Sequence, residues 1–124
     1  MREIEYRGKL LNGNVWIVGC LVRLSHHYFI LVEEHHYESC HIWHEVDPNT
    51  VGQYTGLKAN GVKIFEGDIL QDEDKRIGFV EFNKGRFVGD FDGRTYYYEL
   101  YLDAEKSEVI GNRHDNPELL EAGE

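Results

Sequence analysis

Closely spaced glycines restrict the fold of this chain more than any other feature of its sequence. Glycines at positions 52, 56, 61 and 67 interrupt residues 51–70 about every five residues, which excludes a long helix there. Between the glycines lie short runs rich in β-branched and aromatic residues, a pattern typical of strands joined by tight turns. The sequence therefore predicts an all-β protein with short helices. Four dipeptides are predicted turns: Asn12-Gly13, Asn60-Gly61, Lys84-Gly85 and Asp92-Gly93.

The N-terminal segment predicts a β-hairpin over residues 3–24. Residues 4–11 alternate apolar and polar side chains, as a half-buried strand does. Asn12-Gly13 then favours a type I′ turn, which needs positive φ at both positions. Residues 15–24 carry apolar side chains on both faces, so we expect a well-buried strand with Cys20 in the core.

Residues 28–32 are predicted as a third strand, and residues 33–46 are ambiguous. As a helix, this segment would align His36, Cys40 and His44 at four-residue spacing. The neighbouring strands and the Ile42-Trp43 pair favour a strand over residues 41–46. Asp47 then caps a short helical turn that begins at Pro48.

The C-terminal half predicts further strands and a short helix. Its order of turn and strand resembles an SH3-like, partly open barrel. We therefore expect an N-terminal hairpin unit over residues 1–47 and a barrel unit over residues 48–124, either separate or around one shared core. The predicted strands are 68–71, 76–83, 86–91, 95–102 and 108–112, and Asn116-Pro117 begins the helix.

The charge of the chain disfavours sequence-independent binding of nucleic acid. The formal net charge is −10, and no cluster of lysine and arginine is present. An acidic surface of this kind can instead mimic nucleic acid and dock on a basic protein. With two cysteines and no apolar run of membrane-spanning length, we expect a cytoplasmic protein with free thiols and no membrane partner.

Four blocks of the sequence resemble the YopX family of phages and prophages, over nearly the whole chain. The opening block holds Arg2-Glu3-Ile4, Arg7-Gly8-Lys9, Asn12-Gly13 and Trp16. The central blocks are Val46-Asp47-Pro48 with residues 50–57, and Asn60-Gly61 with residues 64–69. The closing block is residues 108–112 with residues 116–120. Where the family usually has one more residue, an acidic one, this chain has only Lys58-Ala59 between Leu57 and Asn60. The resemblance implies a homo-oligomer of uncharacterised role and supplies no catalytic residues.

A metal site is the first candidate function of residues 33–46, the histidine-rich segment. Imidazole and thiolate groups are good zinc ligands, and the candidates are His36, Cys40 and His44, with His35 and His41 nearby. Against this, the segment has no second cysteine pair and no HExxH motif, and adjacent histidines on a strand point to opposite faces. We therefore expect a polar strand or loop without a bound metal or cofactor.

Two pairs of carboxylates are candidates for acid–base catalysis. Glu66 with Asp68, and Asp90 with Asp92, are spaced to share one face of a strand. Each pair flanks a turn glycine, and neither is accompanied by a nucleophile or a partnered base. The structural alternative is that Gly67 supplies an unusual backbone angle and Asp68 caps the loop.

The interaction candidates are a glycine-bracketed loop and two tyrosines. Gln53, Tyr54 and Thr55 lie between Gly52 and Gly56, where they could cradle a phosphate or a peptide, although the loop matches neither nucleotide-binding glycine motif. The structural alternative is that the glycines permit a tight crossing of the chain. Tyr97 and Tyr101 share a face of a predicted strand, and tyrosine is enriched at protein interfaces.

These observations predict a non-enzymatic interaction or assembly protein of a phage or prophage, associating with itself or with a host or phage protein. Two alternatives remain open at this point. One is a nucleic-acid-binding module that uses the barrel face, and the other is a metal-dependent hydrolase that uses the histidine-rich segment.

Overall fold

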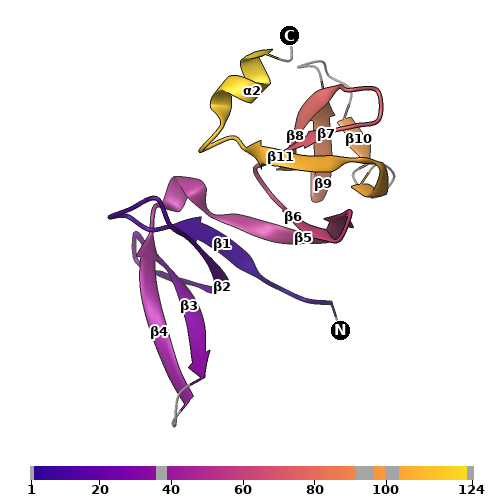
Figure 1. Ribbon diagram of the computed structural model, residues 1–124. Coiled ribbons are helices and arrows are strands. Elements are labelled where there is room, and N and C mark those ends of the chain that lie inside the picture. Colours follow the sequence, from indigo (N-terminus) through magenta and orange to yellow (C-terminus); the bar gives the residue numbers. More distant parts are fainter. Residues whose placement is uncertain (1, 36–38, 92–96, 100–103, 123–124) are drawn as a thin grey trace. The chain divides into compact units, whose positions relative to one another are not determined.

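A computed structural model describes residues 2–35, 39–91, 97–99 and 104–122 of the 124-residue chain (Figure 1). Residues 33–35, 39–41, 91 and 97–99 are described by their backbone alone. The chain divides into two compact units, Met1–Tyr54 and Thr55–Glu124, and each is described by itself. The predicted boundary between residues 47 and 48 stays a prediction.

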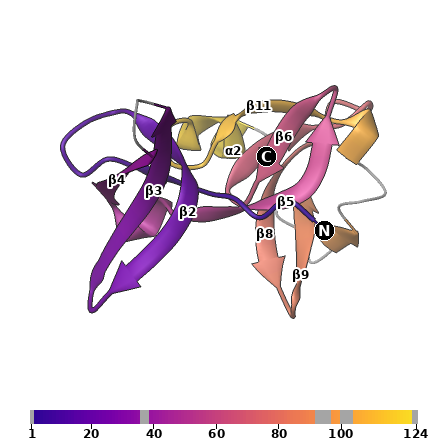
Figure 2. The same ribbon diagram turned by 90° about the horizontal axis from the view of Figure 1, so that it is seen from below.

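Unit 1 is built from antiparallel strands. Its elements are β1 (Tyr6–Lys9), β2 (Trp16–Leu24), β3 (His27–His35), β4 (Ser39–Val46), the 3-10 turn η1 (Pro48–Thr50) and the start of β5 (Gly52–Ala59). The strand order is β4-β3-β2-β1-β5, and Figure 2 shows β2 and β3 running side by side. The predicted hairpin over residues 3–24 and the strand assignment of residues 41–46 are confirmed.

The turn between β1 and β2 differs from the prediction. Asn12 and Gly13 both lack a positive φ, so they do not form a type I′ turn. A longer loop runs from Leu10 to Val15, closed by a 3.0 Å hydrogen bond that the Leu10 N–H donates to the Val15 carbonyl. The prediction of a type I′ turn here was wrong.

The burial of β2 also differs from the prediction. None of its nine residues is fully buried, and Cys20 is exposed rather than in the core. Apolar side chains on both faces of a strand allow both faces to be buried. Each face is buried only where another layer of the protein covers it. Within unit 1, the side chains that are fully buried include Ile30 on β3 and Val46 on β4.

The predicted cap, Asp47, follows β4 and hydrogen-bonds to β1. Asp47 Oδ1 accepts a 3.0 Å hydrogen bond from the Asn49 N–H, which confirms Asp47 as the cap of the turn beginning at Pro48. Thr50 Oγ1 donates to the Asp47 carbonyl at 2.6 Å and accepts from the Lys9 N–H at 2.8 Å. The Asp47 N–H in turn donates to the Lys9 carbonyl at 2.8 Å. Strand β1 therefore contacts both β2 and the end of β4.

Unit 2 holds a hairpin and an open sheet. The remainder of β5 pairs with β6 (Val62–Phe65), and a five-stranded antiparallel sheet has the order β10-β9-β8-β7-β11. A core cluster of Ala59, Ile64, Leu70, Val80 and Ala104 joins the hairpin to the sheet. The remaining elements are β7 (Asp68–Gln71), β8 (Ile77–Asn83), β9 (Arg86–Phe91), β10 (Tyr97–Glu99), the 3-10 turn η2 (Ala104–Lys106), β11 (Glu108–Asn112) and the helix α2 (Pro117–Ala122).

The glycine turns of unit 2 agree with the prediction where the structure describes them. Asn60 and Gly61 have φ of 50° and 79°, and Lys84 and Gly85 have φ of 52° and 81°, the positive values that a type I′ turn needs. The turn at Asp92-Gly93 and the ends of the strand predicted over residues 95–102 lie outside the described residues. The strands over 68–71, 86–91 and 108–112 are confirmed at both ends.

The all-β class with short helices is confirmed, but the sheet of unit 2 is not closed into a barrel. Strands β10 and β11 lie at its two ends, and within the described ranges they do not pair with each other. Among those same residues, no helix is long and apolar enough to cross a membrane.

Candidate interaction surface

The metal-site candidates are not brought together in the part of the chain that the structure describes. His44 lies half-buried on β4, directly opposite Ile30 of β3, and Cys40 lies four residues earlier on the same strand. His36 lies outside the described residues. Among the described residues, no group of three or more histidine, cysteine, aspartate or glutamate side chains could hold a metal ion.

Asp68 has a structural role in the turn before β7. Its side chain is 2% exposed, and Oδ2 accepts a 2.7 Å hydrogen bond from the Phe65 N–H. Gly67 between them has φ of 95°, a backbone angle that favours glycine. Asp68 therefore holds the β6–β7 turn, as the structural alternative for the Glu66 and Asp68 pair predicts.

Asp90 of the second carboxylate pair is half-buried on β9. Burial raises the pKa of its carboxyl above the usual range, and the negative charge of Glu81 on the neighbouring strand β8 raises it further. Asp90 Oδ1 is buried and has no hydrogen-bond partner among the described residues. Its predicted catalytic partner, Asp92, lies outside them.

The glycine-bracketed segment between Gly52 and Gly56 is a strand rather than a loop. Gln53 pairs with Tyr6 of β1, and the Tyr54 N–H donates to the Glu5 carbonyl at 2.8 Å. The Tyr54 side chain is buried, while Gln53 and Thr55 are half-buried. Thr55 Oγ1 donates to the Ile64 carbonyl at 2.8 Å. These polar groups serve the sheet, and a binding role for Gln53, Tyr54 and Thr55 stays a prediction.

The tyrosine candidates are described only in part. Tyr97 lies on β10, where its backbone pairs with Asp90 of β9. Tyr101 lies outside the described residues. An interface at Tyr97 and Tyr101 therefore stays a prediction.

Exposed apolar side chains gather in unit 1, which the sequence reasoning missed. Eight large hydrophobic side chains are exposed among the described residues, and six of them belong to unit 1. Two of the eight, Val62 and Phe82, belong to unit 2. The six are Ile4, Leu11, Val15, Val18, Leu24 and Trp43. The signal in the sequence is the run over residues 15–24 with apolar side chains on both faces, which predicts burial but supplies exposed side chains in the structure.

Three of these six side chains share one face of the sheet. Residues directly opposite each other in an antiparallel ladder point to the same side. The register pairs Cys20 with Leu31 and Leu31 with Trp43, and alternation along β2 adds Val18 and Leu24. We call this surface the β2–β4 face, formed by Val18, Cys20, Val22, Leu24, Phe29, Leu31 and Trp43. The rings of Phe29 and Trp43 meet edge to face, with centroids 5.9 Å apart.

Charged groups border the β2–β4 face. The Arg7 guanidinium lies 4.9 Å from the centroid of the Trp16 ring, in a cation–π contact. His27 Nδ1 lies 2.9 Å from Glu45 Oε2, and both side chains are accessible to solvent. An apolar centre with a polar border is the usual arrangement of a protein interface.

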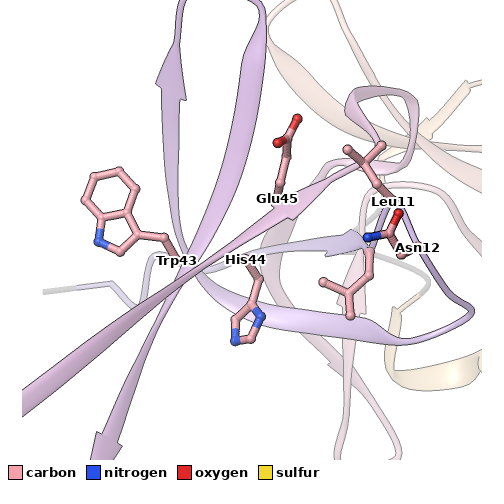
Figure 3. Close-up of a pocket in the computed structure, with 6 residues that line it drawn as sticks. Leu11, Asn12, Trp43, His44 and Glu45 are labelled. Atoms are coloured by element: carbon pink, nitrogen blue, oxygen red, sulfur yellow. The ribbon is translucent and has the colours of Figure 1, made fainter.

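A pocket of about 310 Å³ opens where the β1–β2 loop meets β4 (Figure 3). The Leu11 N–H donates to the Glu45 carbonyl at 3.4 Å, and Leu10 forms a β-bridge with Val46. Trp43 and His44 leave β4 on different sides (Figure 3). Leu11 and Trp43, about half exposed, supply apolar surface. The lining residues are Leu10, Leu11, Asn12, Trp43, His44 and Glu45.

Comparison with known proteins gives a family match and a structural match. A family model described as YopX protein matches residues 15–121. The crystal structure of protein EF1440 from Enterococcus faecalis is similar in fold, with a TM-score of 0.62 and 23% sequence identity over 97% of this chain and 99% of that one. No match was found among curated proteins.

Proposed function

Because this chain belongs to the YopX family, we propose that it is a non-enzymatic protein of a phage or prophage, since the resemblance to that family supplies no catalytic residues. In this proposal the protein assembles with copies of itself in the cytoplasm. The observation that carries the proposal is the concentration of exposed apolar side chains in unit 1, which holds six of the eight among the described residues. Three of the six, Val18, Leu24 and Trp43, share the β2–β4 face, and apolar side chains grouped on one surface mark interaction sites more often than scattered ones do.

The chemistry of the candidate sites supports an interaction role over an enzymatic one. Asp68 is engaged in a turn, and the polar groups of Tyr54 and Thr55 hydrogen-bond within their own units. The net charge of −10 argues against nucleic acid as the partner, since an acidic field repels phosphates. Apolar side chains such as Trp43 and Leu24 favour a protein surface instead.

The test of this proposal is the molar mass in solution, measured by light scattering over a concentration series. One chain has a mass of 14.5 kDa. We expect a discrete mass at a whole multiple of this value, decreasing toward it on dilution as the assembly dissociates. A mass of one chain at every concentration, up to the solubility limit, would contradict the proposal.

A further inference from the structure

Strand β4 lies at the end of the sheet order, so among the described residues no neighbouring strand runs along one of its edges. Two hydrogen bonds show which of its backbone groups point to that outer edge. The Leu11 N–H donates to the Glu45 carbonyl, and the Asp47 N–H donates to the Lys9 carbonyl. The backbone N–H and C=O of one strand residue point to the same side, and the side alternates along the strand. The odd-numbered residues of β4 therefore direct their backbone groups outward.

Trp43 and His41 follow the same alternation and turn their N–H and C=O groups away from β3. The β3–β4 register is continuous from Tyr28 opposite Val46 to His35 opposite Ser39, so no bulge changes the alternation. Among the described residues, no strand pairs with the outer edge between Ser39 and Trp43. This stretch is a row of available donors and acceptors, which is what an added strand requires.

The available edge lacks the protection that isolated edge strands usually carry. Natural edges are blocked by lysines or other charges, by prolines, by bulges or by a covering element. The six residues from Ser39 to His44 include no lysine, arginine, aspartate, glutamate or proline. An uncharged strand can pair with a copy of itself without placing like charges opposite each other.

The β1–β2 loop limits where an added strand can lie. It covers the edge of β4 from Glu45 onward, so the available part ends at Trp43. The pocket lined by Leu11 and Trp43 lies at this end. Leu11 is 52% and Trp43 49% exposed, so apolar surface there is available for a neighbouring strand.

From this geometry we propose that β4 pairs antiparallel with β4 of a second copy of the chain, across a two-fold axis. The inference rests on the proposed self-assembly and names its contact. An uncharged, self-complementary strand edge favours a second copy, because a two-fold axis lets each copy offer the same outward groups to the other. The pairing joins two sheets into one through main-chain hydrogen bonds.

A comparison of Trp43→Pro with Trp43→Ala tests the backbone contact itself. Both variants lack the indole, and only proline also lacks the outward N–H, which the β3–β4 ladder does not use. We expect the W43P dimer to dissociate about 10- to 100-fold more readily than the W43A dimer, measured by light scattering on dilution. Equal dissociation constants for the two variants would overturn the pairing. Circular dichroism should show the same strand content in both.

The variant Val18→Lys tests whether the edge of β4 or the β2–β4 face forms the contact between the two copies. Val18 is exposed on β2, an inner strand of the sheet, so a lysine there leaves the edge of β4 unchanged. We expect V18K to retain the wild-type dimer. A V18K monomer together with an intact W43P dimer would overturn the β4 contact and leave self-assembly standing. A wild type that stays monomeric would overturn both proposals.

Amide hydrogen exchange of the wild type gives a reading that does not depend on any variant. In the paired form the Trp43 N–H is hydrogen-bonded to the second copy, so its exchange should slow as protein concentration rises. The Leu31 N–H, on the inner strand β3 and paired with Cys20 of β2, is the internal comparison and should change little. A Trp43 exchange rate that is independent of concentration, measured where light scattering shows an assembled species, would overturn the pairing.

Discussion

Gly8 and Gly19 lie on neighbouring strands at positions where a side chain would collide with the sheet. A Cβ on Gly8 would lie 2.8 Å from Cγ2 of the buried Val46. A Cβ on Gly19 would collide with the Leu31 carbonyl oxygen, a backbone atom. Backbone atoms in a sheet cannot move independently of their hydrogen bonds, so Gly19 is the less tolerant of the two.

We therefore expect Gly19→Ala to lower the free energy of unfolding by about 1–3 kcal/mol, the usual cost of forcing extra atoms into a packed site. The measurement is urea unfolding followed by tryptophan fluorescence. Gly13→Ala is the matched control, because a Cβ there would have no atom within 4 Å and Gly13 has no positive φ. Its effect should be within about 0.5 kcal/mol of zero. Similar losses for both variants would contradict the steric argument.

Substitutions of Asp68 distinguish the contribution of its hydrogen bond from that of its charge in the β6–β7 turn. Its Oδ2 accepts from the Phe65 N–H at 2.7 Å in a buried setting. Asp68→Ala leaves that donor unsatisfied, so we expect a loss of about 1–3 kcal/mol in the free energy of unfolding. Asp68→Asn keeps an acceptor oxygen and should lose less, as measured by thermal or urea unfolding. Equal losses for D68N and D68A would show that the charge, which both variants lack, matters more than the hydrogen bond.

The β8–β9 turn places a lysine in a backbone conformation that lysine rarely adopts. Lys84 has φ of 52°, and Asn is the non-glycine residue best suited to this region. Lys84→Asn should raise the free energy of unfolding by about 0.5–1 kcal/mol. Lys58→Asn makes the same change of charge at an exposed position of strand β5 and should not stabilise the protein. Equal gains from both would assign the effect to net charge instead.

The adjacent strands β8 and β9 carry a pH-dependent contribution to stability. Burial, and then the charge of Glu81, raise the pKa of Asp90 above its unfolded value of 3.8. The folded state then binds its proton more tightly than the unfolded state. Stability is therefore lost as pH rises from about 3.8 through the folded pKa. Asp90→Asn should be more stable than the wild type at pH 7, and the difference should shrink on acidification.

The control for Asp90 is Glu81→Gln, which removes only the smaller of the two causes. Its gain in the free energy of unfolding at pH 7, measured by urea unfolding, should be smaller than that of D90N. A D90N protein that is less stable than the wild type at pH 7 would indicate that the ionised carboxylate has a stabilising partner.

The strands could be predicted from sequence more accurately than their turns and their burial. Asn60-Gly61 and Asn12-Gly13 are the same dipeptide, yet only the first adopts the positive φ values of a tight turn. Leu10 and Leu11 instead bond to β4, which lengthens the first loop, and that long-range contact is not visible in local sequence. In the same way, the apolar pattern of β2 does not reveal that Val18 and Cys20 face solvent.

The candidate surface was harder to predict than the fold, because it depends on which strand ends the sheet. Sequence reasoning selected Gln53, Tyr54 and Thr55 from their flanking glycines, and the structure places them in a strand with their own hydrogen bonds. Nothing local in residues 39–44 distinguishes an edge strand from an inner one. The importance of Trp43 emerges only from the strand order and from the bonds at Glu45 and Asp47.

The net charge of −10 leads to a further prediction for the proposed dimer. Two copies repel each other, and added salt screens that repulsion, since the Debye length falls from about 10 Å at 0.1 M to about 3 Å at 1 M. We therefore expect the dissociation constant of the dimer to decrease as sodium chloride rises over this range, measured by sedimentation equilibrium. A dimer that weakens with salt would point to attraction between opposite charges at the contact.

Strand β5 belongs to both units, pairing through Gly52 and Gln53 with β1 of unit 1 and lying beside β6 in unit 2. Consider a genetic recombination between relatives that joins the N-terminal part of one chain to the C-terminal part of another. No recombination point within residues 52–59 would leave the pairing of this strand undisturbed. A crossover there would combine one parent's β1 partner with the other parent's β6 partner in a single strand. Recombinants should survive best when the whole strand is inherited from one parent together with the partner residues on either side.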